Sequence, residues 1–286
     1  MNQDVDGDRP AVGRERAAAV GLVLAATVSP QVGAAFAVTL FDELSPPGAA
    51  FLRLAFAAIV LMAIWRPRLH GDLRLIVAFG AALGLMNWST YEAISRIPLG
   101  VAVTITFAGP LLVAVIGSRR PLDGLWIALA AVGIVLLVDP GGGSMDSVGV
   151  GFALVAAACW AAYIYLSKRT GAAFPGGSGL ALAMVVGALI VLPPGVIQAG
   201  SALTQPDLLG AALIVSLASS VVPYSLELEA LRRLPEEVLG VLMSLDPAVA
   251  ALAGFVMLGQ DLGARDVLAI AMVVVASAGA AIFSHR

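Results

Sequence analysis

Ten long runs of apolar residues limit what this chain can fold into. Each run holds about 17 to 24 residues, and an α-helix of that length crosses a hydrocarbon core about 30 Å thick at a rise of about 1.5 Å per residue. The runs cover residues 17–40, 47–64, 74–95, 99–117, 121–138, 148–167, 178–198, 207–230, 236–257 and 263–284. The sequence therefore predicts an all-α membrane protein with ten transmembrane helices.

The composition argues against several classes of protein. Hydrophobic residues make up 60% of the chain and charged residues 12%, whereas soluble domains hold about half and about a quarter. The connections are too short for a nucleotide-hydrolysing domain, and the sequence has no P-loop motif. With a single cysteine, Cys159, and two histidines, His70 and His285, we expect no disulfide, metal or cofactor. The expected partners are the lipid bilayer and a small-molecule substrate, and no nucleic acid.

A short motif occurs twice at a fixed spacing. Residues 92–98 recur 137 positions later as residues 229–235, and Pro110 recurs at the same shift as Pro247. Because each copy contains five helices, an odd number, the second copy enters the membrane from the opposite side. Such inverted repeats are typical of secondary transporters, whose substrate site lies near the midplane between the repeats. The sequence thus predicts two inverted five-helix repeats.

The repeat and the basic residues define the domains and the orientation. The predicted domains are an N-terminal tail (1–16), a first repeat (17–138), a Gly-rich linker (139–147) and a second repeat (148–286). Arg96 and Arg265 are the basic residues of the loops on one side of the membrane. All other Lys and Arg residues, except Arg53 inside the second span, fall on the other side. By the positive-inside rule, both termini are expected in the cytoplasm.

Polar side chains inside the spans indicate a central cavity. Each costs a few kcal/mol in hydrocarbon unless it faces protein or water, so we expect these residues to line a common site. The candidate substrate-binding residues are Gln31, Asn87, Trp160, Tyr163, Tyr224 and Asp246. For the aromatic residues, packing between helices is the alternative. The fifth and tenth spans are almost wholly apolar, which predicts that they lie at the periphery against lipid or a second copy of the chain in a homodimer.

Three charged residues within the spans are candidates for coupling or gating. Asp246 is the deepest acid, and it either carries a proton, binds a substrate ammonium, or is a buried carboxyl bonded to a neighbour. Glu227 lies near a helix end and is either a gate or an acid that reaches water. Arg53 either extends outward to water, pairs with Asp42 or Glu43, or binds a substrate carboxylate.

Several motifs resemble those of a known family. They are Met86-Asn87, Pro98-Leu99-Gly100-Val101-Ala102-Val103, Gly109-Pro110, Ser118-Arg119-Arg120-Pro121, Ala158-Cys159-Trp160-Ala161, Pro223-Tyr224-Ser225-Leu226-Glu227, Leu242-Met243-Ser244 and Asp246-Pro247. On these residues the chain resembles the EamA division of the drug/metabolite transporter superfamily, in particular its bacterial threonine/homoserine exporters. Arg53 matches an Arg that the family carries early in its second helix. Similar sequences usually have Glu at the position of Gln260, and their acid before the proline is commonly Glu, where this chain has Asp246.

The resemblance implies secondary active efflux of small amino acids, of the threonine and homoserine class, across the inner membrane in exchange for protons. In the expected mechanism of alternating access, kinks at Pro110 and Pro247 let the repeats rock about the cavity. Asp246 would accept the substrate ammonium, and Asn87 or Arg53 would bind its carboxylate. We expect a transporter and no enzyme. The alternatives are a broad-specificity exporter of drugs or metabolites, and a non-transporting membrane protein or intramembrane enzyme.

Overall fold

The computed structural model describes residues 9–68, 71–116, 121–138, 145–231 and 241–283, and within these ranges the chain forms helices, turns and loops but no strand. The first half holds α1 (Arg9–Val38), α2 (Phe41–Leu44), α3 (Pro46–Trp65), α4 (Leu73–Ile94), α5 (Leu99–Thr106), α6 (Ala108–Ile116) and α7 (Pro121–Val138). The second half holds α8 (Ser147–Ala173), α9 (Ser178–Ala199), the 3₁₀-helix η1 (Gly200–Thr204), α10 (Pro206–Ser216), the π-turn η2 (Leu217–Val221), α11 (Val222–Leu231), α13 (Asp246–Leu258) and α14 (Ala264–Phe283).

Eight segments of the described chain are long and apolar enough to cross a membrane. They are Gly21–Val38, Pro46–Trp65, Leu73–Ile94, Ser147–Ala173, Ser178–Thr204, Pro206–Leu226, Val241–Leu258 and Ala264–Ile282. Two shorter apolar helices, Leu99–Val113 and Gly124–Leu137, occupy the predicted fourth and fifth spans. The prediction of an all-α, multi-pass membrane protein is therefore confirmed.

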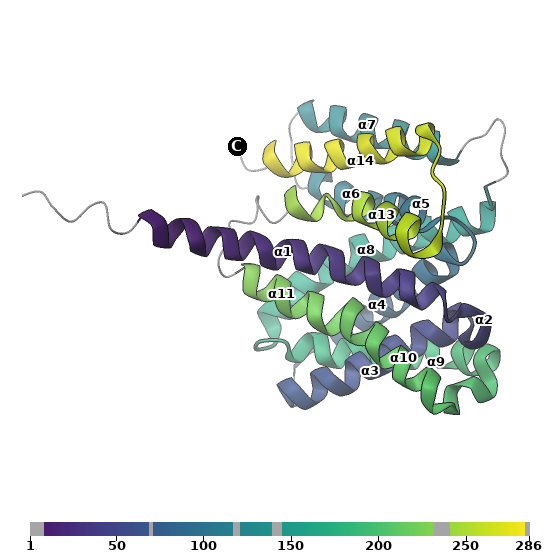
Figure 1. The fold of residues 1–286 in the computed structure, drawn as a ribbon. Helices are drawn as coiled ribbons and strands as arrows, with labels where there is room; N and C mark the ends of the chain where they lie inside the picture. Colours follow the sequence, from purple (N-terminus) through teal and green to yellow (C-terminus); the bar gives the residue numbers. More distant parts are fainter. Residues whose placement is uncertain (1–8, 69–70, 117–120, 139–144, 232–240, 284–286) are drawn as a thin grey trace, which may run out of the picture.

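The helices pack side by side in one bundle (Figure 1). α7 and α14 form an outer layer next to α5, α6 and α13, and α3, α9 and α10 lie on the opposite side. α1, α4, α8 and α11 lie between these two groups. The fifth and tenth predicted spans thus lie at the periphery, where Leu125, Val132 and Val275 are exposed. Such side chains are compatible with lipid tails, which are as apolar as leucine.

Glycines let neighbouring helices approach closely. A Cβ added at Gly84 of α4 would lie 2.8 Å from the carbonyl oxygen of Gly187 in α9. A Cβ added at Gly100 of α5 would lie 2.6 Å from the Cα of Ala251 in α13. Close packing of this kind stabilises helix pairs in lipid, where no hydrophobic effect drives association. The glycines therefore position α9 against α4 and α13 against α5.

Two of the predicted spans are interrupted close to a proline. The fourth span divides at Phe107 into α5 and α6, because Pro110 has no N–H to donate to the carbonyl of Thr106. In the ninth span, a turn at residues 244–245 precedes Pro247, which lies in the first turn of α13. The two breaks occupy equivalent positions in the sequence repeat.

Other departures from the predicted spans concern their interior and their ends. The eighth span contains the π-turn Leu217–Val221, which the apolar pattern did not predict. α1 begins at Arg9, inside the segment expected to be a tail, and α8 continues to Ala173 instead of ending near residue 167. Helices can extend beyond the hydrocarbon core into the interface, so the apolar run alone does not define their ends.

Candidate functional site

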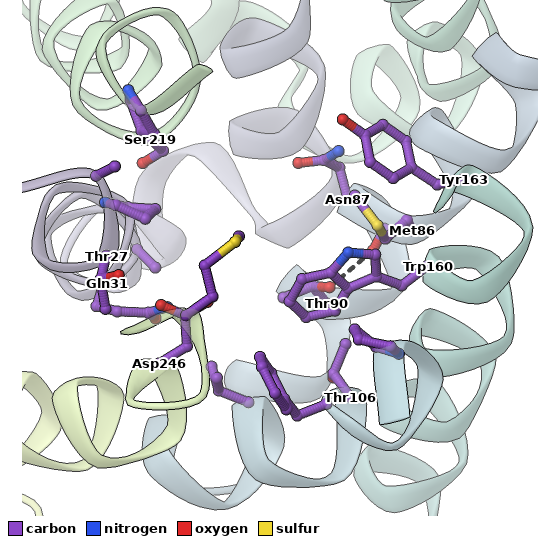
Figure 2. Close-up of a pocket in the computed structure, with 18 of the residues that line it drawn as sticks. Thr27, Gln31, Met86, Asn87, Thr90, Thr106, Trp160, Tyr163, Ser219 and Asp246 are labelled. Atoms are coloured by element: carbon purple, nitrogen blue, oxygen red, sulfur yellow. Dashed lines mark hydrogen bonds between the residues drawn. The ribbon is translucent and has the colours of Figure 1, made fainter. Parts of the chain in front are cut away.

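A cavity of about 410 Å³ lies within the bundle, a size in the range of small-molecule sites, which span about 300–1,000 Å³. Its walls come from α1, α3, α4, α5, α6, α8, α11, α13, α14 and the π-turn η2 (Figure 2). All the predicted substrate-binding residues line this one cavity, namely Gln31, Asn87, Trp160, Tyr163, Tyr224 and Asp246. Arg53 and Pro110 line it as well. The roles assigned to these residues stay predictions.

Polar side chains lie on two opposite walls of the cavity. Figure 2 shows Thr27 and Gln31 of α1 near Asp246 of α13, with Asn87 of α4 and Trp160 of α8 on the opposite wall. Gln31, Asn87 and Asp246 are buried, with exposed fractions of 8%, 3% and 6%. Asp246 lies in the first turn of α13, where the unpaired N–H groups of a helix stabilise negative charge.

The two aromatic residues of α8 both line the cavity and pack against other rings. Trp160 meets Phe107 edge-on, with ring centroids 5.4 Å apart, and Tyr163 lies 5.2 Å from Phe79 at a tilt. Edge-on and tilted arrangements are favourable geometries for a pair of aromatic rings. Trp160 and Tyr163 can therefore both pack between helices and line the cavity. The ring contacts hold each side chain in a defined place.

Arg53 lies inside the bundle and is held by neighbouring helices. Its Nε donates to Ser220 Oγ at 3.1 Å and its Nη2 donates to the carbonyl oxygen of Ser219 at 2.8 Å. Its Nη1 donates to Tyr91 Oη at 3.5 Å, and the guanidinium carbon lies 5.5 Å from the Tyr91 ring centroid. In the described chain, Arg53 forms no ion pair with Asp42 or Glu43. Arg53 lines the cavity, and its binding of a substrate carboxylate stays a prediction.

The π-turn η2 explains how Arg53 is held. A π-turn leaves carbonyl groups outside the regular helical hydrogen-bond pattern, and such turns occur often at functional sites. Here the carbonyl of Ser219 accepts from Arg53, and the carbonyl of Ala218 accepts from Ser29 Oγ of α1 at 2.6 Å. Ser216 Oγ donates to the backbone carbonyl of Arg53 at 2.8 Å. The turn thus joins α1 and α3 beside the cavity.

The lining of the cavity extends along much of the length of the bundle. In α14 its lining extends to Ala280 and Ala281, close to the C-terminal end of the helix. In the other direction the lining reaches Tyr91 and Leu99, both of which are fully buried. The Arg9 end of α1 and the Phe283 end of α14 lie on the same side in Figure 1.

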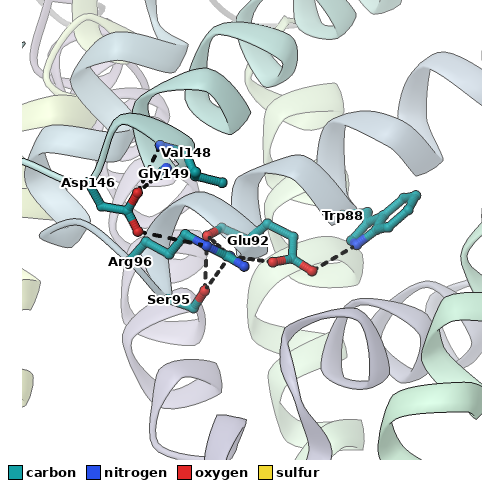
Figure 3. A network of polar contacts seen from close by, with 7 residues as sticks. All are labelled: Trp88, Glu92, Ser95, Arg96, Asp146, Val148 and Gly149. Atoms are coloured by element: carbon teal, nitrogen blue, oxygen red, sulfur yellow. Dashed lines mark hydrogen bonds and ion pairs between the residues drawn. The ribbon is translucent and has the colours of Figure 1, made fainter.

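A second polar network lies at the C-terminal end of α4 (Figure 3). The buried Glu92 forms an ion pair with Arg96 and accepts a hydrogen bond from Trp88 Nε1 at 3.2 Å. Arg96 Nε lies 3.9 Å from Asp146 Oδ2, and the Asp146 carboxylate caps the start of α8 by accepting from the N–H of Val148. The network ties the end of α4 to the start of α8 and does not line the cavity.

The remaining predicted residues lie outside the cavity or outside the description. Pro247 is buried in the first turn of α13. Glu227 belongs to α11, and its side chain lies outside what the structure describes. Residues 229–235, the second copy of the short motif, are likewise largely outside the description. The described residues contain no group of three or more His, Cys, Asp or Glu placed to hold a metal ion.

The chain is similar to known transporters along most of its length. Residues 147–282 match the EamA-like transporter family. The chain is 40% identical over 271 residues to the threonine/homoserine exporter RhtA of Salmonella typhimurium, covering 93% of this chain and 92% of the relative. It is also 40% identical to the protein of that name in Escherichia coli K12, covering 90% and 89%.

Two further similarities are more distant. The uncharacterized transporter YwfM of Bacillus subtilis is 29% identical over 77% of this chain and 70% of its own. A solved crystal structure superposes with a TM-score of 0.66 at 18% identity, covering 94% of this chain and 98% of the other, which shows a shared fold. With relatives at 40% identity over nearly the whole chain, the motif resemblance is confirmed: the chain belongs to the EamA-like transporter family and is a transporter, not an enzyme.

Proposed function

We propose that the protein exports small amino acids of the threonine and homoserine class across the inner membrane. One observation carries the proposal: a single cavity within the bundle is lined by both a carboxylate, Asp246, and a guanidinium, Arg53, among mostly apolar side chains. A zwitterionic amino acid needs one partner for each of its charges, and a charged pair of opposite sign supplies both. The relatives named as threonine/homoserine exporters support the same class of substrate.

In this proposal Asp246 and its neighbours bind the substrate ammonium. An ammonium has three N–H donors, and the α1 and α13 side of the cavity offers the Asp246 carboxylate, Gln31 Oε1 and Thr27 Oγ1 as acceptors. Arg53 binds the carboxylate. Its guanidinium has five N–H donors, of which the contacts to Ser219, Ser220 and Tyr91 use only part.

Alternating access follows from two inverted repeats, and the helix contacts support that arrangement. The contact of α1 with α11 corresponds to the contact of α8 with α4. The contact of α1 with α13 corresponds to the contact of α8 with α5 and α6. Three further pairs join equivalent helices of the two halves: α3 with α9, α5 with α13, and α7 with α14. This is the pattern expected of a two-fold axis in the membrane plane. The breaks next to Pro110 and Pro247 then serve as equivalent hinges.

The orientation and the coupling complete the mechanism. With both termini in the cytoplasm, the cavity accepts substrate from inside the cell when it is open to that side. Rocking of the repeats exposes the same residues to the outside, where a proton from the medium binds Asp246 and releases the ammonium. A neutral Asp246 then returns inward and releases its proton to the cytoplasm, so that each cycle exchanges one amino acid for one proton.

Growth of a deletion strain tests the proposed function. A strain that lacks the protein is expected to become sensitive to externally supplied threonine or homoserine, because it cannot lower their internal concentration. Re-expression of the wild type restores tolerance, and the Asp246→Asn variant, produced at the same level, does not. Unchanged tolerance to both amino acids would refute the proposal, and sensitivity to unrelated drugs alone would favour a broad-specificity exporter.

A further inference from the structure

The amide of Asn87 presents an acceptor to the cavity. Its Nδ2 donates to the carbonyl oxygen of Leu83, one turn earlier in α4, at 2.8 Å. This bond assigns the orientation of the amide, so that the acceptor Oδ1 points away from the Leu83 carbonyl. Within the part of the chain that the structure describes, no residue donates a hydrogen bond to Oδ1. Asn87 has an exposed fraction of 3%, and its amide lies at the cavity wall in Figure 2.

The two threonine hydroxyls of α4 and α5 that line the cavity do not supply the missing donor. Thr90 Oγ1 donates to the carbonyl of Met86 at 2.8 Å, and Thr106 Oγ1 donates to the carbonyl of Ala102 at 2.8 Å. Each hydroxyl proton is therefore used within its own helix. Asn87 thus offers an acceptor that remains available to a ligand.

Such an acceptor distinguishes ligands with a hydroxyl from ligands without one. A buried acceptor that stays unpaired destabilises the complex, and a site built to bond a hydroxyl rejects the analogue that lacks it far better than an apolar pocket rejects an added hydroxyl. We infer that Asn87 Oδ1 accepts the hydrogen bond of the substrate side-chain hydroxyl, and that Asn87 determines specificity for hydroxy amino acids. The inference rests on the proposed function, and it leaves the carboxylate to Arg53.

A single deoxy analogue provides the probe. Threonine and homoserine both become 2-aminobutyrate when the side-chain hydroxyl is replaced by hydrogen, and valine replaces the threonine hydroxyl with a methyl group. We would measure efflux of each radiolabelled compound from proteoliposomes that contain the purified full chain. For the wild type, kcat/KM for threonine should exceed that for 2-aminobutyrate and valine by about tenfold or more.

Two variants test the assignment. Asn87→Leu keeps the size of the side chain and removes the acceptor, so threonine efflux should fall about tenfold or more while 2-aminobutyrate efflux changes little. Ser89→Ala is the matched control, because Ser89 is a buried polar residue of the same helix that does not line the cavity. It should keep the wild-type ratio of threonine to 2-aminobutyrate.

The outcomes separate this inference from the proposed function. Equal transport of threonine and 2-aminobutyrate by the wild type refutes the role of Asn87, and so does an Asn87→Leu variant that loses both substrates equally. If Asn87→Leu does not fold, the wild type still tests the inference: 2-aminobutyrate that competes with threonine efflux as well as unlabelled threonine does would refute it. Wild-type vesicles that carry neither threonine nor homoserine would instead refute the proposed function.

Discussion

Replacing Gln260 with leucine should destabilise the contact between the two halves of the chain. Gln260 follows α13, and its Oε1 accepts a hydrogen bond from the backbone N–H of Leu99, the first residue of α5, at 3.0 Å. The first N–H groups of a helix have no partner within the helix. Leu99 has no exposed surface, so water cannot replace the lost acceptor.

The size of the effect follows from this burial. A buried donor left without a partner costs about 1–3 kcal/mol, and 1 kcal/mol shifts the unfolding midpoint of a chain of this size by about 2 °C. Gln260→Leu should therefore lower the midpoint by about 2–6 °C. Gln260→Glu should not, because a carboxylate also accepts hydrogen bonds and is stabilised at a helix N-terminus. The capping role is thus available both to Gln and to Glu at this position.

The assay can use the single cysteine of the chain. Cys159 is half-buried, so a thiol-reactive fluorogenic dye reports unfolding as the thiol becomes accessible. Membrane proteins often unfold irreversibly, and midpoints are therefore compared at one heating rate. Gln205→Leu is the matched control, because Gln205 is exposed and makes no side-chain cap at the start of α10. A Gln260→Leu midpoint equal to that of the wild type, or a Gln260→Glu midpoint as low as that of Gln260→Leu, would contradict the capping role.

Three further predictions concern packing, the polar network and topology. Gly84→Ala should lower the free energy of unfolding by about 1–3 kcal/mol, and the midpoint with it, because its Cβ would lie 2.8 Å from the Gly187 carbonyl. Gly210→Ala, with open space around it, should not, and equal midpoints would refute the close packing of α4 on α9. Arg96→Gln should destabilise the protein more than the double variant Glu92→Gln/Arg96→Gln does, because the single change leaves a buried carboxylate without its ion pair. Additive effects of the two changes on stability would argue against the pair. In a Cys159→Ser background, single cysteines at Arg96 and Arg233 should react with impermeant reagents from opposite faces of the membrane, and labelling from one face would rule out inverted repeats.

The sequence predicted most of the helices because membrane-spanning segments must bury their backbone hydrogen bonds and expose apolar side chains. Because of that constraint, the apolar runs coincide closely with the membrane-spanning helices. For example, α7 begins and ends at the same residues as its apolar run. The residues of the cavity could be predicted for the related reason that a polar side chain within a span is costly unless it has a protein or aqueous environment. Gln31, Asn87 and Asp246 illustrate this, since each is buried and lines the cavity.

What the sequence could not predict depends on contacts between distant segments. The π-turn at Leu217–Val221 requires Ser29 and Arg53 to bond its freed carbonyls, and no local pattern contains those partners. The cap from Gln260 to Leu99 joins residues 161 positions apart. The orientation of the Asn87 amide depends on its bond to Leu83, which is a property of the folded helix and not of composition.

Proton-driven transport by the purified protein tests the central role of the cavity most directly. Proteoliposomes with an imposed proton gradient and labelled threonine should show saturable, gradient-dependent flux for the wild type. The Asp246→Asn variant, inserted to the same extent and with an unfolding midpoint near that of the wild type, should show none. Undiminished gradient-driven threonine flux in that variant would remove Asp246, and with it the proposed coupling in this cavity, from the mechanism.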